Sequence, residues 1–490
     1  MPRPFVVPPL VAIALFACAP EPVAPPAVVV SPPVTPVVIV APPPTPPPAP
    51  VEPFAIAYRH LLEQMVRVDT SHGHETTLLE PIAARYRQAG VPVQLLESSP
   101  GRGNLIARLK GKGDKKPLLL LAHVDVVPTE GQPWTVPAFE VTEKDGFLWG
   151  RGVNDDKAMA AAIVAITLEL VRDKAPLARD VIVALTAGEE TGGGAGARWL
   201  TENHKELLDA DIALNEGSGP GLTDDGEKVR TVNIATAEKL YQTFKLVVSG
   251  TGGHSSMPPT DGDAVTTLAR ALEKVGTHRF AAHLLPEAKA AFAQEIVGSS
   301  PAVAAALKRA ILSAPSISAA DDKILSTDKF LNAQMRTTCI ATMLSAAPQD
   351  NLLPTTAEAQ VNCRILPGET RDAVMAALKA TVADPKVSVE FGASLEGMVS
   401  SPMSDEVLTA VTQAAAAHFP GADVAPSMVT GATDSRYVRQ IGIKSYGVSP
   451  VFRSRPEIPH FAHGPDERVP AKWFPEGGAY LKDVVRALAL

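Results

Sequence analysis

A histidine and an aspartate stand close together where an apolar segment of the chain ends. His123 and Asp125 follow a run of leucines that begins at Leu118. Because side chains alternate along a strand, the two project from the same face. An imidazole can bind a metal ion while a nearby carboxylate holds its second nitrogen. A simple hydrogen bond between the two side chains is the alternative, and this pair alone leaves both interpretations open.

Glutamates follow two other apolar segments in the same way. Glu189 and Glu190 come after residues 181–185, and Glu216 follows residues 212–214. Ligands of α/β sheets bind at the carboxyl ends of the strands. One of two adjacent glutamates could therefore bind a metal ion while the other acts as a general base toward a metal-activated water. A solvated pair of surface glutamates is the alternative.

Two further segments supply the remaining polar donors. Asp155 lies between a glycine-rich turn and a helix start, where an aspartate ordinarily caps the helix, but its carboxylate could instead point inward and bridge two cations. His463 stands in a loop near the C-terminus. The complete candidate ligand set is His123, Asp155, Glu190, Glu216 and His463. With Asp155 as the bridge, two ions about 3.5 to 4 Å apart would share a water, as in many aminopeptidases.

The elements that must position these residues alternate between strands and helices. Helical periodicity or strand-like apolar runs cover residues 54–68, 76–89, 104–109, 118–127, 156–171, 180–186 and 195–201. This alternation predicts an α/β catalytic domain with a mixed, mostly parallel sheet and helices on both faces.

The pattern changes in the middle of the chain. Expected strands at residues 241–249, 335–342 and 358–366 surround a long alanine-rich helical stretch at residues 284–312. This segment predicts an inserted α+β lid or dimerisation domain over residues 238–396. Helix and strand patterns then resume from residue 405 to residue 451, so the catalytic domain is expected to comprise residues 54–237 and 397–490.

The N-terminus has the residue pattern of an export signal. Residues 1–18 combine Arg3 with an apolar run too short to span a bilayer, which predicts a signal peptide. Residues 15–18 resemble a bacterial lipoprotein box and predict lipidation of Cys18; a plain signal peptide is the alternative. Residues 19–53 are rich in proline and predict an extended linker. We therefore expect the protein on the periplasmic side of a bacterial membrane, held there only by its lipid anchor.

Composition limits the classes of protein. The 490 residues are 46% hydrophobic and 20% charged, with a net charge of -8, which is typical of a soluble enzyme of two domains and excludes a basic surface for nucleic acid. Beyond Cys18 the chain has only Cys339 and Cys363. Two cysteines are too few for a disulfide scaffold, but an oxidising compartment would permit one bond between them.

The motifs occur in an order that resembles a known family. They are similar to those of the di-zinc peptidases and amidohydrolases that include carboxypeptidase S, aminoacylase, glutamate carboxypeptidase and carnosinase. The matching segments are His123-Val-Asp125, Gly150-Arg-Gly, Asp155-Asp156-Lys157, Glu189-Glu190, Asn215-Glu216-Gly217, Gly253-His254, Asn351-Leu-Leu-Pro, Arg364 and His463-Gly. The resemblance extends from about residue 54 to the end of the chain, and Thr236-Ala-Glu-Lys239 looks most like the carboxypeptidase S branch.

The resemblance implies how two metal ions are held. His123 and Glu216 would bind one zinc ion, and Glu190 and His463 would bind the other. Asp155 would bridge them. Cobalt or manganese could replace zinc.

The resemblance also implies roles beyond the ligands. Glu189 would be the general base, Asp125 would orient the metal-binding histidine, and the peptide bond before Asp156 would be cis. His254 would reach the substrate carbonyl, in dimeric members from a neighbouring subunit.

Four residues are expected at the substrate. Arg364 and Asn351 would bind its free carboxylate, a task that suits a guanidinium group. Gly431 and Thr433 lie in a segment that resembles the family's late substrate loop. The predicted function is carboxypeptidase S-like hydrolysis of an amide bond in small peptides or N-acyl amino acids. An aminoacylase-like deacylase is the alternative, and a non-catalytic tethered peptide-binding protein is a third interpretation.

Overall fold

The structure, a computed structural model, describes residues 52–490 except residues 224, 395–399 and 453–461. Residues Glu52–Leu490 form one compact unit. The signal peptide, Cys18 and nearly all of the proline-rich linker lie outside the described residues, so these assignments stay predictions. None of the described helices combines the length and the apolar character that crossing a membrane requires.

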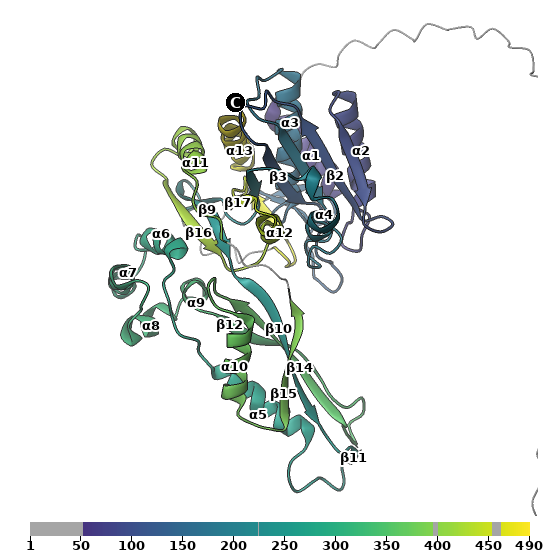
Figure 1. Cartoon of the computed structure of the whole chain (residues 1–490), viewed down its shortest axis with the longest axis vertical. Helices are drawn as coiled ribbons and strands as arrows, with labels where there is room; N and C mark the ends of the chain where they lie inside the picture. The colour runs from purple at the N-terminus through teal and green to yellow at the C-terminus, as the bar shows by residue number, and fades with distance from the viewer. Residues whose placement is uncertain (1–51, 224, 395–399, 453–461) are drawn as a thin grey trace, which may run out of the picture. The chain divides into compact units, whose positions relative to one another are not determined.

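A nine-stranded mixed sheet carries the polar segments (Figure 1). Its strand order is β1-β2-β6-β3-β7-β17-β9-β16, and β8 pairs with β9. Of these strands, β2, β3, β9, β16 and β17 are labelled in Figure 1. The strands are β1 (Val93–Glu97), β2 (Gly103–Leu109), β3 (Leu118–His123), β6 (Val181–Thr186), β7 (Ile212–Asn215), β8 (Pro220–Leu222), β9 (Val229–Glu238), β16 (Asp423–Val429) and β17 (Lys444–Gly447). The central strands β6, β3, β7 and β17 run parallel. Their carboxyl ends therefore meet at one edge, where β3 ends in His123.

Helices cover both faces of this sheet, and every side chain of β3 and β6 is therefore buried. Leu118 and Leu120 pack with one group of helices, whereas Leu119 and Leu121 pack with the other. The first group is α1 (Phe54–Val66), α2 (Glu75–Gln88), α3 (Lys157–Arg172), α11 (Asp405–His418) and α13 (Phe474–Ala489). The second group is α4 (Ala197–Asn203) and α12 (Ser435–Gln440). The α/β class with helices on both faces is thus confirmed.

A separate four-stranded antiparallel sheet lies between β9 and α11 in the chain. Its order is β12-β14-β10-β15. The strands are β10 (Leu240–Ser249), β12 (Thr338–Ser345), β14 (Thr356–Ile365) and β15 (Val387–Ser394), and α5 (Ala264–Thr277) and α10 (Arg371–Val382) pack on it. The sheet falls inside the segment predicted as the insert, but the domain boundaries at residues 238 and 396 stay a prediction.

The alanine-rich segment differs from the expected single helix. It forms α6 (Pro286–Glu295) and α7 (Pro301–Ser313), because Gly298 has a φ of 89° and the Ser300 side chain caps α7. The helices α8 (Ala319–Leu325) and α9 (Lys329–Met335) follow and share a small core with them. The strand expected at residues 335–342 therefore begins three residues later, after α9 has ended.

Small elements complete the fold. They are a three-stranded sheet of β4 (Thr142–Lys144), β5 (Phe147–Trp149) and β18 (Arg468–Pro470), a pair of β11 (Gly253–His254) and β13 (Leu352–Leu353), and the 3-10 helix η1 (Lys205–Leu207). The pairing of β18 with β5 brings the segment after His463 beside the segment that leads to Asp155.

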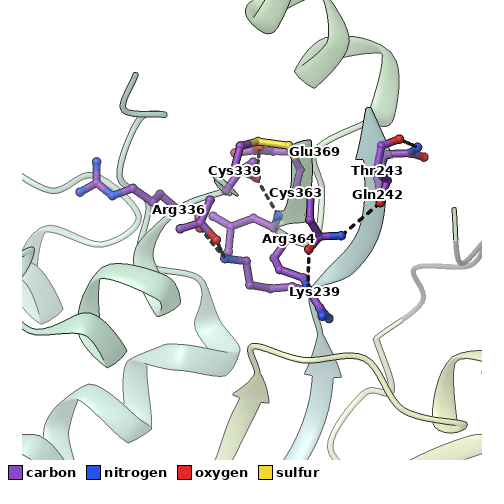
Figure 2. Close-up of a disulfide and its surroundings, with 12 residues drawn as sticks. Lys239, Gln242, Thr243, Arg336, Cys339, Cys363, Arg364 and Glu369 are labelled. Carbon is purple, nitrogen blue, oxygen red and sulfur yellow. Dashed lines mark hydrogen bonds between the residues drawn. A yellow bond between two sulfur atoms is a disulfide. The ribbon is translucent and has the colours of Figure 1, made fainter. Parts of the chain in front are cut away.

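Cys339 and Cys363 form a disulfide, which the sequence had left open. The bond joins β12 to the neighbouring β14, where the two cysteines face each other in register. Figure 2 shows it beside Arg364, the residue that follows Cys363 on β14. The edge strand of the second sheet is therefore covalently attached to the strand that carries a candidate substrate residue.

His418 connects the last turn of α11 to α13. Its Nδ1 lies 2.7 Å from Glu476 Oε1, and its Nε2 lies 2.8 Å from Asp483 Oδ2. Burial lowers the pKa of His418, but the two carboxylates more than offset this effect and raise it above its ordinary value. The stabilisation that follows is complete below the unfolded pKa of about 6.5 and is lost as pH rises through the folded pKa.

We therefore expect His418→Asn to destabilise the protein more at pH 6 than at pH 9. The difference should be about 1 kcal/mol, since charge-assisted hydrogen bonds weaken when they are partly exposed to solvent. Urea denaturation at the two pH values, followed by tryptophan fluorescence, measures it. An equal loss at both values would show that the imidazolium charge contributes nothing.

Candidate active site

His123 begins the cluster of polar side chains at the edge of the sheet. Its Nε2 lies 3.0 Å from Asp155 Oδ1 and 3.7 Å from Glu216 Oε1. Asp155 comes from the loop before α3, and Glu216 follows β7 directly. The ends of three elements thus place one imidazole and two carboxylates together.

His463 supplies the second half of the cluster. Its Nε2 lies 2.9 Å from Glu190 Oε2 and 3.4 Å from Asp155 Oδ2. One oxygen of Asp155 therefore faces His123 and the other faces His463. This is the arrangement that a bridging carboxylate requires, and all five predicted ligands lie in the cluster.

The cluster concentrates negative charge in a buried place. Burial raises the pKa of Glu190, and burial and the nearby Asp155 raise the pKa of Glu216. Burial also raises the pKa of Asp155, but hydrogen bonds from His123 and His463 hold it below its ordinary value. Hydrogen bonds of the His463 ring to Asp155 and Glu190 raise the pKa of His463 to about 10. Carboxylates crowded in this way favour the binding of cations.

The donor set fits divalent metal ions. Ligand atoms of His123, Asp155 and Glu190 lie within 4.8 Å of one another, and so do those of His123, Glu189 and Glu216. The buried Oε1 of Glu190 has no hydrogen-bond partner among the described residues. Imidazole nitrogens and carboxylate oxygens are ligands that zinc, cobalt and manganese accept. The residues present therefore fit a dinuclear centre.

Asp125 contacts both the histidine and the glutamate loop. The Nδ1 of His123 lies 3.0 Å from the main-chain oxygen of Asp125 and 3.5 Å from its carboxylate. That carboxylate accepts hydrogen bonds from the backbone N–H groups of Glu189 and Glu190, at 3.0 and 3.1 Å. Asp125 therefore holds His123 mainly through its backbone, and its side chain positions the two glutamates.

Comparison with known proteins identifies the family. Residues 119–487 match the model of peptidase family M20/M25/M40. The chain belongs to this family. The peptide bond between Asp155 and Asp156 is cis in this M20 chain, as the resemblance implied.

Two relatives of this M20 chain are named for different activities. The N-fatty-acyl-amino acid synthase/hydrolase PM20D1 of Mus musculus is 30% identical over 439 residues, which cover 84% of each chain. Carboxypeptidase S of Saccharomyces cerevisiae is 31% identical over 268 residues, which cover 51% of this chain and 45% of that protein. The predicted resemblance to carboxypeptidase S is thus confirmed.

Solved structures share the fold of the M20 chain. The M20 family metallo-carboxypeptidase Sso-CP2 of Sulfolobus solfataricus superposes with a TM-score of 0.67 at 19% identity, covering 88% of this chain and 99% of that one. Human carnosine dipeptidase 1 gives a TM-score of 0.62 at 14% identity, covering 89% and 96%. At these identities the likeness concerns the fold alone.

Glu189 lies beside the cluster of candidate ligands, with a guanidinium group next to it. Burial raises the pKa of Glu189, and its Oε1 lies 3.8 Å from Arg436 Nη2. Arg436 is buried on α12, and its guanidinium nitrogens have no hydrogen-bond partner among the described residues. Arg436 could not be recognised from the sequence, because a single arginine two positions after Asp434 gives no spacing signal.

His254 and Asn351 lie together, but away from the M20 cluster. His254 ends β11, where its exposed ring accepts a hydrogen bond from the Ser256 backbone at 3.1 Å. The neighbouring Ser255 N–H donates to Asn351 O at 3.0 Å. Among the described residues, neither side chain contacts the five candidate ligands. Their substrate roles therefore stay predictions.

The remaining substrate candidates have different surroundings. Arg364 stacks over the Tyr241 ring at 4.7 Å, and burial lowers the pKa of its guanidinium. Thr433 is buried, and its hydroxyl accepts a hydrogen bond from Asn215 Nδ2 at 3.3 Å. Gly431 is half-buried beside Val429. Arg364 Nε also donates to Asn362 Oδ1 at 3.3 Å. The substrate roles of Arg364, Thr433 and Gly431 therefore stay predictions.

Proposed function

We propose that this M20 chain hydrolyses the amide bond of small peptides or N-acyl amino acids that carry a free carboxylate, with two zinc ions as cofactors. One observation carries the proposal: the two oxygens of Asp155 face His123 and His463, each of which also faces a second carboxylate. Cobalt or manganese would suit the same ligands.

Different residues of the chain have different roles in the proposed reaction. When bound, the two ions supply Lewis-acid polarisation of the amide carbonyl and lower the pKa of a water. Glu189 accepts the proton of the attacking water and passes it to the departing amine. Asp125 keeps Glu189 in place through the backbone N–H. Arg364 binds the substrate carboxylate, for which its guanidinium offers paired donors.

The two candidate activities differ in the group that lies on the acyl side of the cleaved amide bond. Carboxypeptidase S-like cleavage releases an amino acid from a peptide, whereas a deacylase releases it from an acyl chain. The relative named N-fatty-acyl-amino acid synthase/hydrolase covers 84% of this chain. This coverage supports N-acyl amino acids with long acyl chains as the second candidate substrate class.

A substrate panel distinguishes these activities. Purified protein loaded with zinc is incubated with dipeptides, N-acetyl amino acids and N-fatty-acyl amino acids, and the released amino acid is measured. We expect release that a chelator abolishes, and a much lower rate for substrates whose carboxylate is amidated. Bound zinc without release from any substrate would contradict the proposed hydrolysis.

We also propose export and anchoring through Cys18. The disulfide between Cys339 and Cys363 supports this proposal, because such bonds persist in oxidising compartments such as the periplasm. Mass spectrometry of the mature N-terminus should find a lipidated Cys18. A mature chain that still begins at Met1 would contradict export.

The second sheet supports a homodimer through the lid. Its edge strand β12 exposes the apolar side chains of Ile340, Met343 and Leu344, with exposed fractions of 67%, 61% and 68%. An edge strand with unpaired backbone groups is a template for pairing with a second chain. Light scattering of the purified protein should give twice the monomer mass, and a monomer at all concentrations would contradict this proposal.

A further inference from the structure

Glu467 is a fully buried carboxylate that contacts four hydrogen-bond donors. Its Oε1 accepts from the backbone N–H groups of Gly152, Asn154 and Asp155, at 3.1, 2.8 and 3.1 Å. Its Oε2 accepts from Arg151 Nη1 at 2.7 Å, and both side chains of this ion pair are at most 1% exposed. All four contacts are donors, which suits an ionised carboxylate because it can only accept.

The three N–H groups belong to a loop without regular structure. Residues 150–156 connect β5 to α3, and Gly150 and Gly152 both adopt positive φ. Among the described residues, Glu467 is the acceptor for each of the three N–H groups. A buried N–H without a partner costs about 1 to 3 kcal/mol. The conformation that presents Asp155 to the cluster therefore depends on Glu467.

The same network reaches the loop of His463. Arg151 Nη2 donates to Gly464 O at 3.1 Å and to Gln132 Oε1 at 2.7 Å. The side-chain amide of Gln132 in turn donates to His463 O at 2.9 Å. Glu467 itself follows His463 by only four residues, and its backbone oxygen accepts from Gly150 N–H at 3.0 Å. One buried ion pair thus ties both loops together.

We propose that Glu467 is a positioning residue that sets the separation of Asp155 and His463 and thereby the affinity of the site for its second metal ion. This inference rests on the dinuclear centre proposed above. The two side chains are 3.4 Å apart, Nε2 to Oδ2, and no other buried carboxylate among the described residues bonds to the Asp155 loop. Mutation of a residue that holds a metal ligand, without touching the metal itself, typically lowers metal affinity about 10- to 100-fold.

The test is a metal titration of Glu467→Gln. The amide keeps the size of the side chain but replaces one carboxylate oxygen with an NH2 group, which cannot accept. Either the backbone N–H groups of the loop or Arg151 therefore lose their acceptor. We expect the apoprotein to bind the first Zn²⁺ nearly as wild type and the second about 10- to 100-fold more weakly, in competition with a chromophoric chelator. The visible spectrum of the Co²⁺ form should change as well, which a general loss of stability would not cause.

Asp180→Asn is the matched control. Asp180 is also a buried carboxylate, and it accepts from Arg108 Nε at 2.7 Å and from the Gly111 backbone at 2.9 Å. It precedes β6, whereas Glu189 and Glu190 follow that strand. We expect the control to lower the thermal midpoint without weakening either Zn²⁺.

Gln132→Ala keeps the test decisive if Glu467→Gln does not fold, because Gln132 is only half-buried. It should weaken the second Zn²⁺ roughly 3- to 10-fold, less than a direct partner does. Wild-type affinity in a folded Glu467→Gln, or in Gln132→Ala if that variant alone folds, overturns the inference, and so does equal weakening in Asp180→Asn. A wild-type protein that binds fewer than two ions would instead overturn the dinuclear centre itself.

Discussion

Glu189→Gln is expected to keep both metal ions and to lose turnover about 10²- to 10⁴-fold, the usual contribution of a general base. The amide has nearly the size of the carboxylate but cannot accept the proton of the attacking water. Glu189 lies beside Arg436, and its backbone N–H is held by Asp125. The fold of the loop should therefore survive the substitution, and the loss should appear in kcat rather than in KM.

Steady-state kinetics and metal analysis of the same preparation measure this effect. Glu202→Gln is a suitable control, because it makes the same chemical change at an exposed position of α4, where Glu202 pairs with Arg198 on the same helix. The control should have wild-type kinetics. Unchanged turnover in Glu189→Gln would remove this residue from the mechanism.

Asp155→Ala should have an effect of similar size for a different reason. Its carboxylate faces both His123 and His463, so its removal takes a ligand from each metal position. We expect the purified variant to hold at most one ion and to lose at least about 10³-fold in kcat/KM, equivalent to about 4 kcal/mol of transition-state stabilisation.

The control for this prediction is Asp145→Ala, which removes an exposed carboxylate from the turn between β4 and β5. Plasma mass spectrometry of both variants gives the metal content. The control should retain two ions. A fully active Asp155→Ala with two bound ions would rule out a bridging role.

The sequence predicts the centre of the fold well, for a physical reason. Strands covered on both faces, such as β3 and β6, are continuous apolar runs that end in polar residues, and the next residues reach one edge of the sheet. The flanking strands β1 and β9 could not be recognised in this way, because polar residues interrupt them. The break at Gly298 was missed because alanine-rich sequence on both sides of it favours helix equally.

The same distinction holds for the candidate site, where the sequence predicts some functional residues and not others. Four ligands could be proposed because His123, Glu190 and Glu216 end or follow apolar strands and Asp155 precedes a helix, whereas His463 stands in a loop and its role was implied by the resemblance. Arg436 and Glu467 could not, since their importance comes from burial and from contacts with distant segments. The location of His254 away from the cluster also depends on tertiary structure. The sequence identifies His254 as a histidine of the matching motif, but it does not give the distance of this imidazole from the candidate ligands.

In the proposed dinuclear centre, Asp155 joins two metal positions in one hydrolytic site. The most direct test measures the number of divalent ions per chain by plasma mass spectrometry while a chelator is dialysed in and zinc is then returned, with amide hydrolysis assayed at each step. We predict two ions per chain in the active protein, loss of hydrolysis as they leave, and recovery when both return. Full hydrolysis by protein that holds no metal would contradict the claim.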